Sequence, residues 1–452
     1  MKRRQFISTS MLSPLLMSRQ AARRERSESS PAGEKGWTLA GRSLEDLRRQ
    51  YHYDLFEDFL PFMDAHVIDH QYGGFMCNTD RDGRNLSGTK NTWFEGRGIW
   101  VYSFLYGNFG HDKKYLDAAR GSLEFILKAK PKDPNALWPT SFTREGRPFG
   151  PPPQNIYGDV FVAEGLAEFA RASGESRYRD LAREILLKCW RIYNRHDYDP
   201  SIVAEYAGPR PLPFAGARVQ GVSMVMIHTI SEMLEAGPEP QLEPIIEECL
   251  HAVLDRHFNP AFALNNELLN HDYSRPTNEL AEFVYTGHSI ETLWMVVAEA
   301  VRRRDPQIFR TAAQRFRRHA EVAWDGVYGG VFRSLNNVDL NLWALDKACW
   351  EQEEVLNGTL LLIEQADDAW AREMYGKMYR YVRAKFPLQP HGYHLWISYA
   401  DRKVTYKPHD TRVENYHHPR HLMLALLALD KLIQQGRAVK PPFAASATQE
   451  EK

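Results

Sequence analysis

The sequence lacks the features that mark several large classes of protein. No run of apolar residues approaches the ~18 that a transmembrane helix needs, which excludes such a helix. Basic and acidic residues nearly balance, 57 against 58, so no overall charge favours nucleic acid or an acidic membrane surface. No glycine-rich Walker loop for nucleotide phosphates is present. We therefore expect neither a nucleic-acid partner nor a membrane partner.

Cysteine is also scarce. The four cysteines are Cys77, Cys189, Cys249 and Cys349, and no two of them form a Cys-x-x-Cys pair. Their wide spacing argues against a disulfide framework and against a zinc motif. The sequence therefore predicts four single buried thiols.

The N-terminus carries a possible export signal. The stretch Lys2-Arg-Arg-Gln-Phe-Ile-Ser8 resembles a twin-arginine signal, and a modest apolar run follows it. The alternative is a disordered basic tail, because no clear cleavage site is visible. We favour export to the periplasm over a cytoplasmic location. In either case we expect residues 1–36 and 439–452 to lie outside one catalytic domain at 37–438.

The rest of the chain repeats a unit of roughly 64 residues. Each unit opens with a strand-turn-strand signal, such as Tyr72 to Gly83 or Val327 to Asn337, and continues with two segments of helical period. The first helix of each unit is predicted to start near Thr92, Tyr157, Gly221, Thr286, Asp346 and His418. With a leading helix at Leu44 to Val67, about six helix pairs result. Closing them into a ring buries apolar faces that an open array leaves exposed, so we predict an all-α, (α/α)6 barrel.

One of the predicted helix starts contains side chains that are suited to catalysis. In Tyr285-Thr-Gly-His-Ser-Ile-Glu-Thr-Leu-Trp294, His288 stands three residues before Glu291 in the opening turn of a helix, with Thr286 as N-cap. Residues three apart share a helix face, so the imidazole and the carboxylate are expected to project together. By itself, such a pair more often forms a structural hydrogen bond than a catalytic site.

Other polar residues fall at equivalent places in the repeat. His417 stands just before Pro419 at another predicted helix start, Arg97 lies in Trp93-Phe-Glu-Gly-Arg97, and Glu354 lies on a third inner helix. Charged side chains on apolar inner faces are costly to bury alone, so they need partners or a ligand. Inner helices of one orientation would gather these residues at one end of the barrel.

These segments resemble the N-acylglucosamine 2-epimerase family, which also contains cellobiose 2-epimerases and aldose-ketose isomerases. The matching segments run in family order from about residue 40 to 435, and they are specific jointly but not singly. They are Gly73-Gly-Phe with Asp80-Arg-Asp-Gly83, Trp93-Phe-Glu-Gly-Arg97, Ser223 to Leu234, Gly287-His-Ser-Ile-Glu291, Trp350-Glu-Gln-Glu-Glu354 and Tyr416-His-His-Pro-Arg420.

The resemblance implies roles for these residues. His288 and His417 correspond to the general acid/base pair, Arg97 to the arginine that holds the sugar oxygens, and Glu291 and Glu354 to the carboxylates that orient histidines and substrate. We further expect a substrate pocket that includes Trp93, Trp350, Arg420, Tyr102 and Asp159. Two departures put the identity of the sugar in doubt: Cys349 stands where many members have a tryptophan, and Val413 where many have a lysine.

Epimerisation at C2 of an open-chain sugar needs a proton removed from one face and returned to the other. Two bases of near-neutral pKa suit this task, and histidine is the natural choice. The resemblance therefore implies a cofactor-independent epimerase of a small reducing sugar, most plausibly interconverting N-acylglucosamine and N-acylmannosamine, with a homodimer possible. A cellobiose or mannose 2-epimerase and an aldose-ketose isomerase remain alternatives.

The same residues allow functions of other classes as alternatives. An (α/α)6 glycoside hydrolase could use Glu291 and Glu354 as its two carboxylates, but the two histidines would then lack a role. A carbohydrate-binding relative without catalysis would not need them either. The pairs His391 with His394 and His417 with His421 have metal-ligand spacing, yet no third ligand joins them, so no metal is expected.

Overall fold

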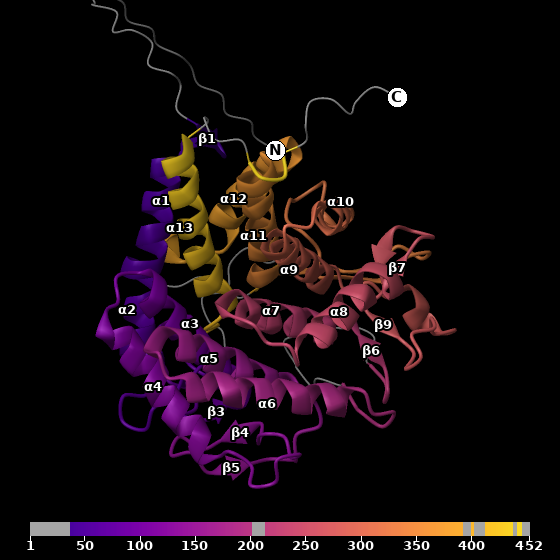
Figure 1. Cartoon of the computed structure of the whole chain (residues 1–452). Coiled ribbons are helices and arrows are strands. Elements are labelled where there is room, and N and C mark those ends of the chain that lie inside the picture. Colours follow the sequence, from indigo (N-terminus) through magenta and orange to yellow (C-terminus); the bar gives the residue numbers. More distant parts are fainter. Residues whose placement is uncertain (1–36, 201–212, 392–398, 402–411, 437–440, 445–452) are drawn as a thin grey trace, which may run out of the picture. The chain divides into compact units, whose positions relative to one another are not determined.

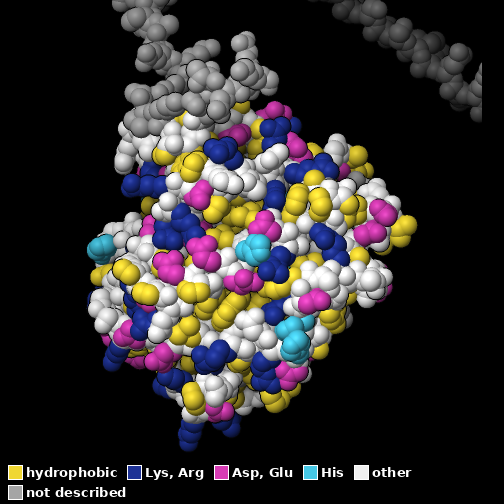
Figure 2. All heavy atoms as spheres, turned by 45° about the vertical axis from the view of Figure 1, so that its right-hand side comes forward, with side chains coloured by type: hydrophobic (Ala, Val, Ile, Leu, Met, Phe, Trp, Pro, Cys, Tyr) yellow, Lys and Arg dark blue, Asp and Glu magenta, His cyan; other side chains and the backbone are white. Residues whose placement is uncertain are grey.

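The computed structural model describes residues 37–200, 213–391, 399–401, 412–436 and 441–444. Among these residues, none of the helices combines the length and the apolar character that crossing a membrane requires. On the face shown in Figure 2, acidic and basic side chains are interspersed. This mixture agrees with the near-zero net charge of the sequence.

Six helices form an inner ring, each packed against the next. Their residues are buried on almost every side, as expected for helices enclosed by a second layer. The ring closes where the last inner helix contacts both the first inner helix and the N-terminal helix of the described structure (Figure 1). The inner helices are α3 (Thr92–Asn108), α5 (Tyr157–Ser173), α7 (Gln220–Ala236), α9 (Thr286–Arg303), α11 (Cys349–Ala366) and α13 (His417–Gln435).

Outer helices cover the ring and are amphipathic. In α10 (Pro306–Ala323), for example, Phe309, Ala312 and Phe316 face the interior while charged residues face outward. The others are α4 (Lys113–Lys128), α6 (Ser176–Tyr193), α8 (Glu243–His251) with the π-helical turn η4 (Ala252–Arg256), and α12 (Ala369–Lys385). The sixth is a continuous helical stretch of α1 (Leu44–His52), η1 (Tyr53–Phe59), α2 (Leu60–Phe62) and η2 (Met63–Val67). This arrangement confirms the predicted (α/α)6 barrel.

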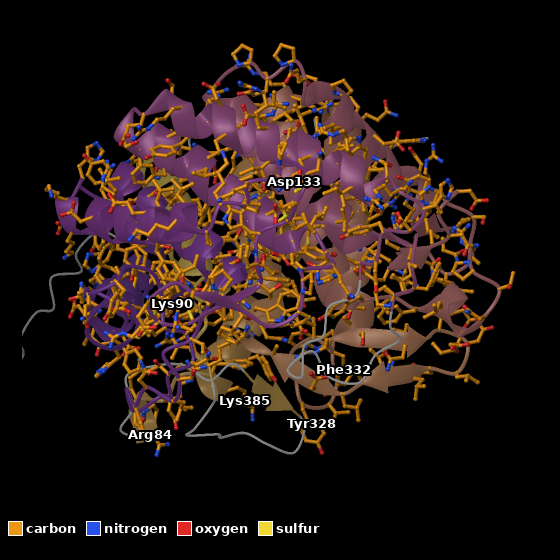
Figure 3. All side chains as sticks on the ribbon, turned by 90° about the horizontal axis from the view of Figure 1, so that it is seen from below. Arg84, Lys90, Asp133, Tyr328, Phe332 and Lys385 are labelled. Atoms are coloured by element: carbon orange, nitrogen blue, oxygen red, sulfur yellow. The ribbon has the colours of Figure 1, made fainter. Side chains whose placement is uncertain are left out.

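Short antiparallel strands precede or link the helix pairs. Strands β3, β6 and β12 run directly into α3, α7 and α11, so they fix where those inner helices begin. Arg84, Tyr328 and Phe332, from loops of two different repeats, lie along one border of the molecule with strand arrows nearby (Figure 3). The pairs are β1 (Thr38–Leu39) with β2 (Arg42–Ser43), β4 (Ser141–Phe142) with both β3 (Lys90–Asn91) and β5 (Pro148–Phe149), β6 (Arg218–Val219) with β9 (Leu268–Leu269), β7 (Phe258–Asn259) with β8 (Leu264–Asn265), β10 (Ser334–Asn337) with β11 (Leu342–Ala344), and β12 (Asp346–Ala348) with β13 (Tyr399–Asp401). Two 3₁₀ turns, η5 (Glu279–Glu282) and η6 (Gln389–His391), complete the described elements.

Most predicted helix starts agree with the structure, and two details differ. Thr286 was predicted as the N-cap of α9 but is its first residue, and its hydroxyl donates to the carbonyls of Phe332 and Arg333 at 2.6 and 2.8 Å. The helix predicted from Asp346 begins at Cys349, because residues 346–348 pair with β13. The repeat pattern also predicts strand-turn-strand segments at Asp199 to Gly208 and at Gly392 to Asp401, and most residues of both lie outside the described part of the chain.

Two strand-to-helix junctions are held by the same device. The Lys90 ammonium donates to Asp69 at 2.9 Å and to the Gly73 carbonyl, and both ionic side chains are fully buried. In a later repeat, Lys347 donates to Asp325 at 2.7 Å and to the Gly329 carbonyl. Gly73 and Gly329 both have φ of +77°, where a side chain would be strained. Each buried lysine thus ties the strand before an inner helix to the preceding glycine turn.

Candidate active site

His288 lies in the first turn of α9 and is held by a carboxylate from another loop. Its Nδ1 atom is 2.8 Å from Oε1 of Glu267, which is 3% exposed and lies between β8 and β9. Because an ionised carboxylate only accepts hydrogen bonds, Nδ1 carries the proton and Nε2 is left with the lone pair. The imidazole is therefore oriented as a base through Nε2.

Packing on both sides limits the position of this imidazole. The ring of Tyr285 lies 4.0 Å from the ring of His288, centroid to centroid. Gly221 of α7 approaches from another side, since a Cβ there would lie 3.0 Å from Nδ1 of His288 and 3.4 Å from Oε1 of Glu267. A side chain at 221 would thus press on the hydrogen-bonded pair of His288 and Glu267.

His417 is the first residue of α13 and lies near the same indole as His288. Trp350 of α11 stacks on His417 with centroids 5.2 Å apart, and its ring is 6.1 Å from that of His288. The Nε2 atom of His417 is 3.8 Å from Glu291, and Nδ1 is 3.6 Å from Glu414. Burial, together with the charges of Arg97 and Arg420, lowers the pKa of His417 well below its ordinary value. This imidazole is therefore neutral near pH 7.

Arg97 of α3 is enclosed by aromatic rings. Its guanidinium carbon lies 4.9 Å from the centroid of Trp93, 4.1 Å from Phe161 and 4.5 Å from Tyr416. Nη1 is 3.9 Å from Oε1 of Glu414, a separation longer than a direct hydrogen bond. The cage fixes a planar cation close to His417.

Arg420 joins the two predicted carboxylates. Its Nη2 donates to Glu291 at 2.5 Å and to Glu354 at 2.6 Å, and Nη1 donates to the Tyr416 hydroxyl at 3.1 Å. Burial raises the pKa of Glu354 to about 7 even though the neighbouring Arg420 opposes this shift. The expected pairing of Glu291 with His288 is therefore replaced: Glu291 pairs with Arg420 and lies beside His417. Arg420, expected to bind substrate, is engaged in an internal network.

Two predicted pocket residues lie elsewhere. Tyr102 packs in the core against Phe75, with ring centroids 5.5 Å apart. Asp159 is 1% exposed, pairs with Lys188 and accepts the backbone N–H of Trp138 at 2.9 Å. Both residues lie on inner helices, but their side chains face outer elements. The predicted start of a helix does not determine how the helix is rotated about its axis, so this direction could not be predicted.

Of the histidine pairs with metal-ligand spacing, His391 and His394 offer no described side chain. In the other pair, Nδ1 of His421 donates to Oδ1 of Asn357 at 2.7 Å.

Glu267 was not anticipated from the sequence. Its signal is the run Asn265-Asn-Glu267 inside an otherwise apolar stretch, three buried polar residues that demand partners.

Comparisons with known proteins identify relatives of the chain. A family model described as N-acylglucosamine 2-epimerase (GlcNAc 2-epimerase) matches residues 48–419. The N-acylglucosamine 2-epimerase of Mus musculus is 24% identical over 353 residues, covering 76% of this chain and 82% of the mouse protein. The solved cellobiose 2-epimerase of Bacillus thermoamylovorans has a TM-score of 0.72 at 14% identity, covering 85% of this chain and 99% of that one.

The fold itself extends beyond epimerases. A glycoside hydrolase family 76 mannosidase from Bacteroides thetaiotaomicron has a TM-score of 0.55 at 11% identity, covering 87% of this chain and 99% of that one. At such identities, structural likeness shows the fold alone. The family model separates the epimerases from other proteins of this fold, because it matches the sequence itself. The match runs from the first helical stretch of the barrel to the start of α13. This chain belongs to the N-acylglucosamine 2-epimerase family.

Proposed function

We propose that the chain is a cofactor-independent sugar 2-epimerase and that its substrates are N-acylglucosamine and N-acylmannosamine. The single observation that carries the proposal is the placement of two imidazoles, His288 and His417, at the starts of two inner helices with Trp350 near both. Both side chains are mostly buried, at 17% and 11% exposure, so they contact a bound sugar more readily than bulk water.

The reaction needs only proton transfers at one carbon. One histidine takes the C2 proton of the open-chain sugar, and the electron pair of the C–H bond moves toward the carbonyl to form an enediolate-like intermediate. The other histidine, which enters this step as the imidazolium, gives a proton to the opposite face of C2, and the carbonyl forms again. The histidine that took the C2 proton is then the imidazolium, so the two rings have exchanged protonation states. Atoms and electrons balance without a hydride acceptor.

The remaining side chains fit supporting roles. Glu267 sets the tautomer of His288, as described above. The caged guanidinium of Arg97 provides a fixed positive charge for the developing oxyanion. Arg420 pairs with both Glu291 and Glu354, so its single positive charge offsets part of the negative charge of these two carboxyl groups beside His417.

The hydrolase alternative is not favoured by this geometry. A glycosidase needs two carboxyl groups on either side of the scissile bond, one of them able to donate a proton. Here Glu291 and Glu354 both accept from the same nitrogen of Arg420, so they share one cation instead of facing each other across a substrate.

Proton NMR in deuterated water tests the proposal. N-acetylglucosamine, N-acetylmannosamine, mannose, glucose and cellobiose are incubated with the wild-type protein and with His288→Ala and His417→Ala variants. Deuterium at C2 together with the 2-epimer, lost in either variant, supports the proposal and names the sugar. A ketose product would instead indicate an aldose-ketose isomerase, and cleavage of a glycoside without exchange would overturn the proposal.

We also propose export through the twin-arginine-like stretch Lys2 to Ser8, which lies outside the described residues. Fractionation of cells that express the full chain, and of cells that express Arg3→Lys/Arg4→Lys, is the test. Wild-type protein retained uncleaved in the cytoplasm would contradict export. Light scattering of the purified protein tests the further prediction of a homodimer.

A further inference from the structure

Three side chains of metal-binding type converge where α11 and α13 begin. Cys349 is the first residue of α11, Glu353 follows one helical turn later on the same face, and His418 is the second residue of α13. One ligand atom from each lies within 4.8 Å of the other two. The Nδ1 atom of His418 and Oε1 of Glu353 are 2.5 Å apart. Figure 1 shows α11 and α13 as neighbours in the ring.

The cluster is enclosed by protein. Cys349 and His418 are each 7% exposed, and Glu353 is 1% exposed. The second oxygen of Glu353, Oε2, is buried and accepts no hydrogen bond of good geometry among the described residues, while the Cys349 thiol lies close enough to interact with this carboxylate. An ionised carboxylate that is buried with one oxygen unbonded is costly, and a cation is the ligand that would remove this cost.

Nearby charges also favour a cation. His418 interacts electrostatically with both Asp54 and Asp58 of η1, so carboxyl groups approach the imidazole from η1 as well as from α11. Burial raises the pKa of Asp58 to about 7, so this carboxyl is only partly ionised near neutral pH. Arg383 pairs with Asp54 at 2.5 Å, whereas Asp58 accepts from the neutral amide of Gln389 at 2.5 Å. Arg81 lies toward the Cys349 side and contributes the opposing positive charge.

We propose that Cys349, Glu353 and His418 form a binding site for one divalent cation of the zinc class. Thiolate, imidazole and carboxylate are the zinc ligands of proteins, and three of them leave one position of a tetrahedron for water or another donor. Binding displaces the thiol proton and the proton shared by Glu353 and His418, and both are released to solvent. Ligand atoms already within 4.8 Å need only a modest approach to meet one ion.

This site is separate from the groups assigned to proton transfer, yet it adjoins them along the chain. Cys349 precedes Trp350, and His418 follows His417. A bound ion would therefore clamp together the two helix starts that carry the indole and one of the two imidazoles. The inference does not depend on the epimerase proposal, because its readouts concern the metal alone.

Cobalt(II) titration of the full-length wild-type protein is the test. Binding at this site gives a one-to-one stoichiometry and a thiolate-to-cobalt charge-transfer band in the near ultraviolet, which Zn²⁺ abolishes by competition. We expect Cys349→Ala to lose the band, and Glu353→Gln and His418→Gln to weaken cobalt binding by about tenfold or more. Cys249→Ala, which removes a buried thiol of α8, is the matched control and should behave as wild type.

A thermal shift separates lost ligands from lost folding. Zn²⁺ should raise the unfolding temperature of the wild type and of Cys249→Ala but not of Cys349→Ala, while circular dichroism shows that each variant remains helical. Absence of the charge-transfer band in the wild type would overturn the inference. The same band retained in Cys349→Ala, or undiminished affinity in both Glu353→Gln and His418→Gln, would overturn it equally.

Discussion

The carboxylate of Glu267 accepts a hydrogen bond from Nδ1–H of His288, with an N···O distance of 2.8 Å. The two residues are 21 positions apart in the sequence and belong to different structural elements. Glu291, which shares a helix face with His288, is instead bound to Arg420. The residue that sets the tautomer of the candidate base therefore comes from the loop between β8 and β9. This relationship leads to a prediction that separates positioning from substrate binding.

Glu267→Gln should lower the rate of C2 proton exchange by on the order of 10²-fold, with little change in KM. The amide keeps the shape of the side chain but can present its NH₂ group to Nδ1, so the ring is no longer held in the tautomer that leaves the lone pair on Nε2. Deuterium incorporation measured over a range of substrate concentrations gives both the rate and KM. A rate equal to wild type would show that Glu267 is only structural.

Gly221→Ala tests the same pair by crowding it. The added Cβ would lie 3.0 Å from Nδ1 of His288, so the imidazole must shift and exchange should fall by at least about tenfold, because small displacements of catalytic groups are costly. Gly107→Ala is the matched control, since that helical glycine meets only Arg171 at 3.7 Å. Equal activity of the two variants in the exchange assay would contradict the close approach.

Much of the barrel can be predicted from the sequence because its determinants are local. Helix starts at Thr92 and Tyr157 follow from hydrophobic period and turn residues close to them in the chain, and the structure agrees. The start predicted at Asp346 failed because the partner strand of residues 346–348 lies near residue 400, where no local pattern reveals it.

The site was less predictable for the same physical reason. The repeat predicted that His288, His417, Arg97 and Glu354 lie at one end of the barrel, but it could not give their partners. The Glu267–His288 and Glu353–His418 pairs each join different elements, and their geometry depends on how neighbouring helices rotate. Cys349 was expected to be a single thiol because no other cysteine lies near it in the sequence, and His418 is remote from it along the chain.

Arg420→Met should destabilise the protein strongly. The guanidinium is 1% exposed and accounts for the short contacts of both Glu291 and Glu354, so its removal leaves two carboxylates without their cation. Breaking a buried ion pair in this way costs about 3–5 kcal/mol of unfolding free energy. Arg317→Met, at an exposed pair with Glu321, is the control and should cost about 0–1 kcal/mol.

Urea-induced unfolding followed by circular dichroism measures both values. Similar midpoints for the Arg420 and Arg317 variants would mean that the two carboxylates take up protons or new partners at little cost. The variant Arg420→Lys adds a further test, because one ammonium cannot reproduce the contacts that the planar guanidinium makes with two carboxylates and a hydroxyl. We expect its stability to lie between those of the wild type and Arg420→Met.

The buried pair of Asp69 with Lys90 should make the free energy of unfolding depend on pH in the acid range. Burial alone would raise the pKa of Asp69, but hydrogen bonds from Arg144 and Lys90 outweigh burial and hold it well below its ordinary value. A depressed carboxyl pKa stabilises the fold above the unfolded-state value of about 3.9, and this contribution is lost as pH falls below that value. Asp69→Asn should therefore cost most near neutral pH and progressively less below about pH 4.

Unfolding free energies of wild type and Asp69→Asn, measured at several pH values, test this expectation. The two curves should converge toward acid pH, because protonation removes the same charge that the substitution removes. Asp117→Asn is a suitable control, since that aspartate pairs with Lys113 in solvent and is 54% exposed, so its substitution should change stability little at any pH. Parallel curves for wild type and Asp69→Asn would mean that the Asp69 carboxylate is not the group whose protonation weakens the glycine turn before α3.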